Sequence, residues 1–401
     1  MQTNIDGIGA LAVHKWRGQF SKLRDTRRRK GKRHRLVDVV LMSLIAMLCG
    51  CDDADEIAVW CQMRSEELEK WFGFKHGPPS QDTILRVFAM IKPKPFSIMV
   101  AGWLRSLRLI PDTGQICVDG KTLRGSLERG GEKRAVHLVS AWMGEVGILL
   151  GQLKTDDKSN EITAIPELLA TLDLSGHTVS IDAAGCQKAI AEQIVDQGGD
   201  YLLAVKENQP RLYGDIDRSF AESRNERNRT IDELERPHAT TAEHVDSGHG
   251  RIEERRATVC RDLQQMTTLD DWPGLSGVGL VESITTDKRT GKISTESRRY
   301  ILSNPDITAE EFLEQTREHW SVESMHWVMD VEFREDASRI TERRAAENFG
   351  LLRRTALGLL KATPLPENFK RMSYKNRRRW CDGRPEYLLR VLLANSVRAT
   401  N

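Results

Sequence analysis

The chain has 401 residues, of which 39% are hydrophobic and 29% are charged, and its formal net charge is +2. These values place it among ordinary soluble globular proteins and exclude a fibrous or low-complexity chain. The length exceeds the size at which one hydrophobic core keeps growing, so two or three domains are expected.

The small net charge hides two strongly basic segments. Residues 22–35 contain nine Lys and Arg against one acid, and residues 370–379 contain six and no acid. Such clusters suit a protein that binds a polyanion, although each could also be a solvated arm without a partner. The residues expected to contact DNA from these segments are Arg28, Arg29, Lys30, Arg377 and Arg378.

Cysteine use and hydropathy exclude several classes of protein. The seven cysteines are scattered and lack the paired spacing of a zinc site or a disulfide framework, so a reducing cytoplasm is expected. Residues 36–51 are apolar but include Asp38, and they fall short of the roughly 20 residues that span a bilayer. A buried helix is expected there, with neither a membrane span nor a signal peptide.

The first part of the chain has helical periodicity. Apolar pairs recur at helical spacing after residue 36, and shorter helical patterns follow up to residue 95. We expect residues 1–95 to form a helical domain beneath the basic arm. This domain is either a DNA-binding module or a cap on the next domain.

A different pattern begins at residue 115, where strands and helices alternate. The predicted order is β-β-β-α-β-α-β, which is that of a ribonuclease-H-like domain. The predicted strands are 115–119, 136–142, 147–154, 177–182 and 201–205, and the predicted helices are about 161–172 and 187–197.

This predicted core is interrupted before its last helix. Residues 211–302 contain a polar helix and several strand-like segments, so they are expected to form a mainly β insertion. A helix beginning near Thr308 then carries Glu323 and is expected to dock on the sheet through Leu313, Trp320 and Trp327. The expected fold is therefore α/β, with core segments 96–210 and 303–362. A helical, basic C-terminal segment, 363–401, follows.

Three acids occupy positions that a metal site in such a core would use. Asp119 and Asp182 each close a predicted strand, and Glu323 lies on the later helix. Carboxylates held in this way can bind a pair of hard divalent cations, which activate water and stabilise phosphoryl transfer. We therefore expect Asp119, Asp182 and Glu323 to be the catalytic residues and to bind two Mg²⁺ ions, for which Mn²⁺ can substitute.

Basic side chains beside these motifs are candidates for binding phosphate. Each could equally be a solvated surface residue. The four residues predicted to contact DNA here are Lys121, Lys206, Arg251 and His319.

Several motifs together resemble the DDE transposases of bacterial insertion sequences, of the type that includes the H-repeat-associated proteins. They are VDGKTLRGS at 118–126, KSNEI at 158–162, IDAAGCQ at 181–187, DYLLAVKENQ at 200–209, SGHGR at 247–251, HWSVESMHW at 319–327 and DVEFRED at 330–336. The resemblance spans nearly the whole chain. It implies Mg²⁺-dependent strand transfer on a ribonuclease-H-like core, with Asp119, Asp182 and Glu323 as the catalytic triad.

This resemblance also implies the partners: the terminal inverted repeats of the element, the target DNA and a second copy of the chain in a homodimer. One departure stands out. The wider group has Tyr, Arg and Lys around its catalytic Glu, where this chain has Thr316, His319 and Asp330, so Asp330 is a candidate for an additional acid near the metal ions. The alternative functions are a nuclease that cuts without joining and a non-catalytic DNA-binding remnant of an element.

Overall fold

The computed structural model describes residues 5–28, 32–127, 135–155, 161–226, 239–248, 250–264 and 266–393. The chain forms two compact units, each assembled from segments distant in sequence. The first unit contains Met1–Pro111, Gly120–Lys158 and Ser324–Asn401, and the second contains Asp112–Asp119 and Ser159–Glu323.

The first unit is mainly helical. Its helices are α1 (Ile5–Gln19), α2 (Leu36–Leu48), α3 (Ala54–Met63), α4 (Ser65–Phe72), α5 (Gln81–Met90), α6 (Pro93–Ser106), α12 (Arg343–Ala362), α13 (Tyr374–Gly383) and α14 (Pro385–Leu392). Almost every residue of α2 is buried, because a helix that is apolar on all sides must be covered on all sides. The prediction of a buried helix here is confirmed.

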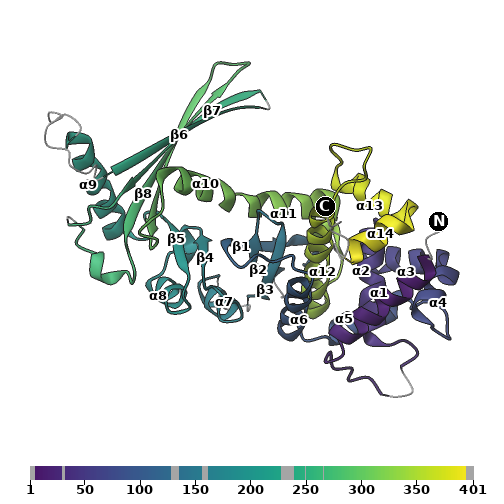
Figure 1. Ribbon diagram of the computed structural model, residues 1–401. Helices are drawn as coiled ribbons and strands as arrows, with labels where there is room; N and C mark the ends of the chain where they lie inside the picture. The colour runs from purple at the N-terminus through teal and green to yellow at the C-terminus, as the bar shows by residue number, and fades with distance from the viewer. Residues whose placement is uncertain are drawn as a thin grey trace. The chain divides into compact units, whose positions relative to one another are not determined.

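The N-terminal and C-terminal helices pack together within this unit. In Figure 1 the yellow α13 and α14 lie beside the purple and blue helices at the start of the chain, and α14 contacts both α1 and α2. The strands β2 (Val136–Met143) and β3 (Ile148–Lys154) form an antiparallel pair on which α12 packs.

The second unit is built on a mixed sheet. Its strands are β1 (Gly114–Leu123), which continues into the first unit, β4 (His177–Ile181), β5 (Asp200–Val205), β6 (Ala239–Gly248), β7 (Arg251–Cys260), β8 (Gly277–Asp287) and β9 (Ile293–Leu302). Its helices are α7 (Glu161–Leu169), α8 (Lys188–Asp196), α9 (Pro210–Glu226), α10 (Ala309–His319) and the start of α11 (Ser321–Glu332). The described strands follow the order β3-β2-β1-β4-β5-β9-β8-β7-β6.

The strands from the predicted insertion extend the sheet itself. β1, β4 and β5 are parallel, and β9 then pairs antiparallel with β5, so that β6–β9 continue the same hydrogen-bonded ladder. The inner halves of β7, β8 and β9 are largely buried and their outer halves are mostly exposed or only partly buried, whereas β6 buries only Ala242. In Figure 1 the labelled strands β6, β7 and β8 extend as long ribbons away from the parallel strands.

All seven cysteines are buried and none is in a disulfide. Burial raises the pKa of the Cys117 thiol, and likewise that of Cys186, to about 12, so both remain protonated at neutral pH. Within the described parts of the chain, no helix is both long enough and apolar enough to cross a membrane.

Candidate active site

Asp119 and Asp182 occupy equivalent positions on neighbouring parallel strands. Asp182 directly follows β4, whereas β1 continues beyond Asp119 to Leu123, so the prediction that Asp119 ends its strand is wrong. The strands β1 and β4 pair in a register that ends with Val118 opposite Ile181, and each acid is the next residue in its chain. Adjacent strands lie about 4.8 Å apart, so the backbone brings these two acids side by side. Both acids are half-buried, whereas Val118 and Ile181 are buried in the core.

The carboxylate of Asp182 is oriented by the turn that follows it. Its Oδ1 accepts the N–H groups of Ala184 at 3.1 Å and Gly185 at 3.3 Å, and it thereby caps a short 3₁₀ helix. The turn is tight enough to require glycine, because a Cβ on Gly185 would lie 2.3 Å from the Ile181 side chain. The Asp-Ala-Ala-Gly sequence thus ends β4 and also fixes the orientation of the Asp182 carboxylate.

Helix α10 is fixed to the same two strands by polar contacts. Gln115 Nε2 donates to the carbonyl of Gln315 at 2.8 Å, and the Cys117 thiol lies 3.5 Å from the carbonyl of Glu318. Going from the first contact to the second, the chain advances by two residues in β1 and by three in α10, so the two elements run in the same direction.

This packing indicates where Glu323 lies relative to Asp119. It lies five residues beyond Glu318, an advance of about 7.5 Å if helical geometry continues. Asp119 lies two residues beyond Cys117, an advance of about 6.6 Å. The two elements thus carry Glu323 and Asp119 forward by similar distances from a shared contact, and Glu323 is exposed at the start of α11.

The expected single helix around Glu323 is in fact two. Helix α10 ends at His319 and α11 begins at Ser321. Of the residues predicted to dock on the sheet, Leu313 is buried in a cluster with sheet residues, but Trp320 is 40% exposed and Trp327 is 61% exposed, so the prediction is wrong for the two tryptophans. Arg298 instead lies 4.0 Å above the centre of the Trp320 ring, in a cation–π contact.

His319 has an internal partner. Its Nδ1 lies 2.9 Å from the hydroxyl of Ser180 on β4. Burial lowers its pKa to about 4, and the nearby Arg298 acts in the same direction. The ring is therefore neutral at pH 7 and does not supply the positive charge expected of a residue that binds phosphate.

Lys121 also forms ion pairs within the protein. Its side chain is buried, and its ammonium lies 2.5 Å from a carboxylate oxygen of Asp330 and 3.5 Å from one of Glu335. The expectation that it contacts DNA is not supported, because two carboxylates already surround its charge. Asp330, considered as an additional acid near the metal ions, is the principal partner of this lysine.

The two C-terminal arginines that were expected on DNA are structural as well. Arg378 is buried, and Arg377 donates to the carbonyls of Leu360 and Thr363. Burial of Arg378 corrects the expectation that this residue faces DNA, whereas Arg377 is half-buried and its contact with DNA stays a prediction. The acceptors of Arg378 are the carbonyls of Met47, Cys51 and Glu332 and the carboxylate of Asp52.

The remaining residues predicted to contact DNA are either exposed or outside the described part of the chain. Arg28, Lys206 and Arg251 are exposed. Arg29 and Lys30 lie outside the described residues.

A cavity of about 610 Å³ opens beside Asp182. Sequence analysis missed most of its polar lining, although the Lys-Glu-Asn-Gln motif after β5 pointed to one side of it. Asn208 donates to the carbonyl of Ala183 at 2.8 Å, which ties that motif to the turn after Asp182. The polar and aromatic side chains that line it include Asp182, Lys206, Asn208, Tyr213, Arg298 and Arg299.

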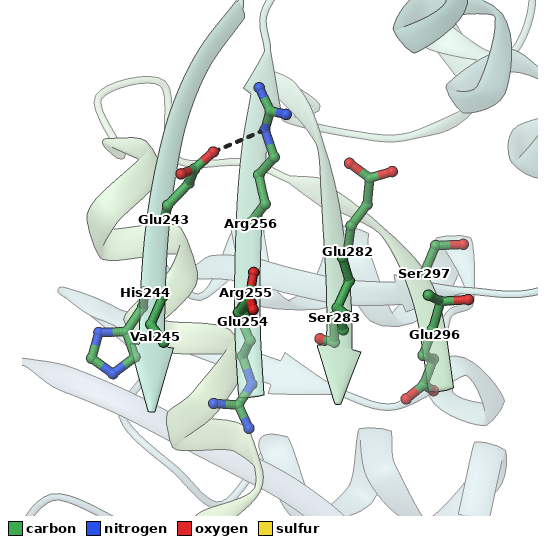
Figure 2. A pocket seen from close by; sticks show the side chains of 12 residues that line it. Glu243, His244, Val245, Glu254, Arg255, Arg256, Glu282, Ser283, Glu296 and Ser297 are labelled. Atoms are coloured by element: carbon green, nitrogen blue, oxygen red, sulfur yellow. Dashed lines mark ion pairs between the residues drawn. The ribbon is translucent and has the colours of Figure 1, made fainter. Parts of the chain in front are cut away.

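A second hollow, of about 540 Å³, lies across the outer halves of β6–β9 (Figure 2). Its lining includes four glutamates, Glu243, Glu254, Glu282 and Glu296, and two arginines, each of which has an acidic partner. Arg256 lies 3.6 Å from Glu243, the contact drawn in Figure 2, and Arg255 pairs with Glu253. Such a surface offers little net charge to a polyanion.

The far ends of the same strands are different. The turn between β6 and β7 lies beside the turn between β8 and β9, because the N–H of Lys288 donates to the carbonyl of Gly250 at 2.8 Å. The nearby acid, Asp287, accepts the backbone N–H groups of Arg289 and Thr290. We call the four exposed cations of these two turns the basic tip. They are Arg251, Lys288, Arg289 and Lys292.

The three acids suit a hard cation by their chemistry. Carboxylate oxygens are the ligands that Mg²⁺ and Mn²⁺ prefer. Across the described residues, however, no group of three or more His, Cys, Asp or Glu side chains is gathered closely enough to hold a metal ion. The backbone thus brings the acids to one region without closing their side chains around a point.

Sheet, acids and basic surfaces together are those of an enzyme that acts on nucleic acid, and comparison with known proteins agrees. Residues 110–359 match the model of the transposase DDE domain, and residues 18–104 match the model of its associated domain. The chain therefore belongs to the DDE transposase family.

Two named relatives are similar over most of their length. "Putative transposase YncI" of Escherichia coli O157:H7 is 38% identical over 85% of this chain and 86% of the relative. "H repeat-associated putative transposase YhhI" of Escherichia coli K12 is 36% identical over 82% of this chain and 85% of the relative. A solved piggyBac transposase synaptic complex covers 97% of this chain and 80% of its own at a TM-score of 0.36 and 10% identity, too weak a likeness to support a conclusion.

Proposed function

We propose that this chain cuts DNA at the ends of its element and joins the freed 3′-hydroxyl groups to target DNA, with Asp119, Asp182 and Glu323 as the catalytic acids. The observation that carries the proposal is the register of β1 and β4, which sets two of these acids side by side on adjacent strands. The contacts of α10 with β1 support placing Glu323 near them. The parallel strands β1, β4 and β5 support a ribonuclease-H-like core.

The cofactor in this proposal is a pair of Mg²⁺ ions, for which Mn²⁺ can substitute. When bound, such a pair activates the attacking oxygen and neutralises the leaving one. The part of the protein is to hold three carboxylates in fixed places, and the backbone N–H groups that hold Asp182 do this for one of them. Three like charges repel each other without a cation, so closing the site would depend on the ions.

The proposed partner is DNA, held by cations that the fold leaves exposed. Lys206 is exposed and lines the cavity beside Asp182, where it can attract a phosphate next to the reacting one. The basic tip and Arg28 would bind the phosphate backbone further away. We propose a homodimer for the reaction, because the two ends of an element must be held together.

The test compares acid-to-amide variants with the parent chain on DNA that carries the element ends. Asp119→Asn, Asp182→Asn and Glu323→Gln should abolish Mg²⁺-dependent cleavage and leave end binding largely intact. Glu314→Gln is the matched control, because Glu314 is an exposed glutamate of α10 without a proposed role. The proposal fails if the three variants cut as well as the parent does.

A second readout does not depend on turnover. A cation that binds the folded chain raises its melting temperature by mass action. Mn²⁺ should therefore stabilise the parent and the Glu314→Gln control, but not Asp182→Asn. Pre-cut element ends then separate a transposase from a nuclease, since a nuclease would leave them unjoined.

A further inference from the structure

We infer that Lys121 and Asp330 are positioning residues whose ion pair sets the spacing between Asp119 and Glu323. This inference rests on the proposed function, because it assigns those two acids to one metal site. Neither Lys121 nor Asp330 needs to touch the metal ions or the DNA in this role.

The pair joins the two chain segments that carry the acids. Lys121 follows Asp119 by two residues in β1, and Asp330 follows Glu323 by seven residues, about two helical turns, in α11. Lys121 Nζ lies 2.5 Å from Asp330 Oδ1 and also donates to the carbonyl of His326 at 3.2 Å. One ammonium group therefore holds α11 at two successive turns.

The pair is anchored in the core of the first unit. Lys121 also lies 3.5 Å from Glu335, whose carboxylate binds Arg354 of α12 through contacts of 2.7 and 3.1 Å. The side chains of Glu335 and Arg354 are fully buried. Burial alone would raise the pKa of Glu335, but the positive charges of Arg354, Arg353 and Lys121 together outweigh it, and the pKa lies below its ordinary value.

Such a network is better suited to fixing the positions of side chains than to increasing the stability of the fold. Removing charges from water costs nearly as much as their attraction returns, so a buried ion pair is weak evidence for a stabilising role. A two-metal site, by contrast, needs ligands that hold two ions about 3.5–4 Å apart. Residues that fix the ligands of such a site are known to affect metal affinity strongly.

The experiment measures Mn²⁺ affinity and melting temperature in the full-length chain. Asp330→Asn should weaken Mn²⁺ binding by about tenfold or more, as removing a supporting group does at other metal sites. Asp38→Asn is the matched control, because Asp38 pairs with Arg17 at 2.7 and 2.8 Å in the same unit. It should lower the melting temperature and leave Mn²⁺ affinity unchanged.

Lys121→Met separates positioning from direct metal binding by Asp330. If Asp330 were itself a ligand, removing the competing ammonium would leave Mn²⁺ affinity equal or tighter. A positioning role predicts weaker affinity for Lys121→Met, and no further weakening when Asp330→Asn is added, because both changes break the same ion pair. Should either variant fail to fold, Lys121→Arg keeps the charge, alters the geometry and should still weaken Mn²⁺ binding.

Two results would overturn the inference, and they differ. If Asp330→Asn and Lys121→Met bind Mn²⁺ as the parent does while Asp182→Asn does not, the positioning role is wrong and the metal site stands. If Asp182→Asn binds Mn²⁺ like the parent, the proposed metal site is wrong and the positioning role falls with it.

Discussion

Arg378 acts as a structural crosslink inside the first unit. Its guanidinium donates to the carbonyl of Met47 in the last turn of α2, to the carboxylate of Asp52 and to the carbonyl of Glu332 at the end of α11. The ring of Phe333 lies 4.3 Å from the same cation. One side chain thus satisfies acceptors from segments that are far apart in the sequence.

Arg378→Ala should lower the free energy of unfolding by about 3–5 kcal/mol, because it leaves a carboxylate and several carbonyls without their donor. Urea denaturation measures this decrease. Arg379→Ala provides the control, since the neighbouring arginine is exposed and its removal should change stability by less than about 0.5 kcal/mol. Equal effects of the two changes would contradict the buried role.

His319 should make stability depend on pH in the acid range. Its pKa is about 4 in the folded chain against an ordinary value of 6.5. As pH falls below 6.5 the unfolded chain takes up the proton first, so stability falls until about pH 4. His319→Asn keeps a polar group near Ser180 but cannot titrate, so urea denaturation across this range should show a flatter profile. An unchanged profile would assign the dependence to other groups, such as His326.

Individual acids could be predicted from the sequence better than individual cations. Asp119 and Asp182 each close an apolar run, which is a local signal in the sequence, although β1 continues past Asp119 to Leu123. Which cations are internal depends on partners that local patterns do not reveal. The acceptor of Lys121 is 209 residues away in sequence and that of Arg378 is 326 residues away.

At the scale of elements, the approach of α10 to the sheet depends on a glycine. Gly279 of β8 faces the ring of Phe312, which is fully buried against Tyr300. A Cβ at this position would lie 2.3 Å from that ring. Helix α10, which precedes Glu323, thus packs against β8 at the position where the strand has no side chain.

Gly279→Ala should therefore lower the free energy of unfolding by about 1–3 kcal/mol, the usual cost of overpacking a core. Thermal or urea denaturation measures it. Gly214→Ala is the control, because the nearest atom to its added Cβ would be 3.9 Å away and alanine favours the helix α9. Comparable destabilisation of both variants would argue against close packing at Gly279.

Two elements show where sequence patterns fail. The strand β6 was not predicted, because it lies at the edge of the sheet and its mostly polar, exposed residues lack strong apolar alternation. The face of the helix around Glu323 was misassigned because the break at Trp320 was not foreseen. Val322, Met325 and Met329 are the buried side of α11.

At the scale of the whole molecule, the distribution of charge separates two kinds of surface on β6–β9. The hollow in Figure 2 has cations with acidic partners, whereas the basic tip has four cations near a single acid that is engaged with backbone. The difference predicts which surface meets DNA.

Replacing Lys288, Arg289 and Lys292 with alanine should weaken DNA binding and reduce the salt dependence of its affinity. The slope against salt concentration should fall by about 0.9 for each phosphate that the variant no longer neutralises. Filter binding or fluorescence anisotropy across salt concentrations provides the measurement. Arg255→Ala with Arg256→Ala is the control, because both cations are paired, and its slope should not change. A tip variant with the parental slope would remove this surface from the DNA interface.

The grouping of segments into units was the least predictable feature. Sequence analysis expected a helical domain at 1–95 and a separate basic segment at 363–401, whereas the described parts of both lie in the first unit. An amphipathic helix shows that one face is covered but not which distant helix covers it. The alternation of strands and helices, which is local, was recovered with boundaries close to those observed.

The buried thiols have a practical consequence. Cys49, Cys51, Cys61 and Cys381 lie in the first unit, and Cys117, Cys186 and Cys260 lie in the second. Each can react with an alkylating reagent only when its surroundings open, so iodoacetamide labelling read by mass spectrometry would time the opening of each unit separately. The native cysteines therefore serve as reporters without an engineered label. Labelling in the presence of DNA or Mn²⁺ would show whether either ligand slows the opening of one unit more than that of the other.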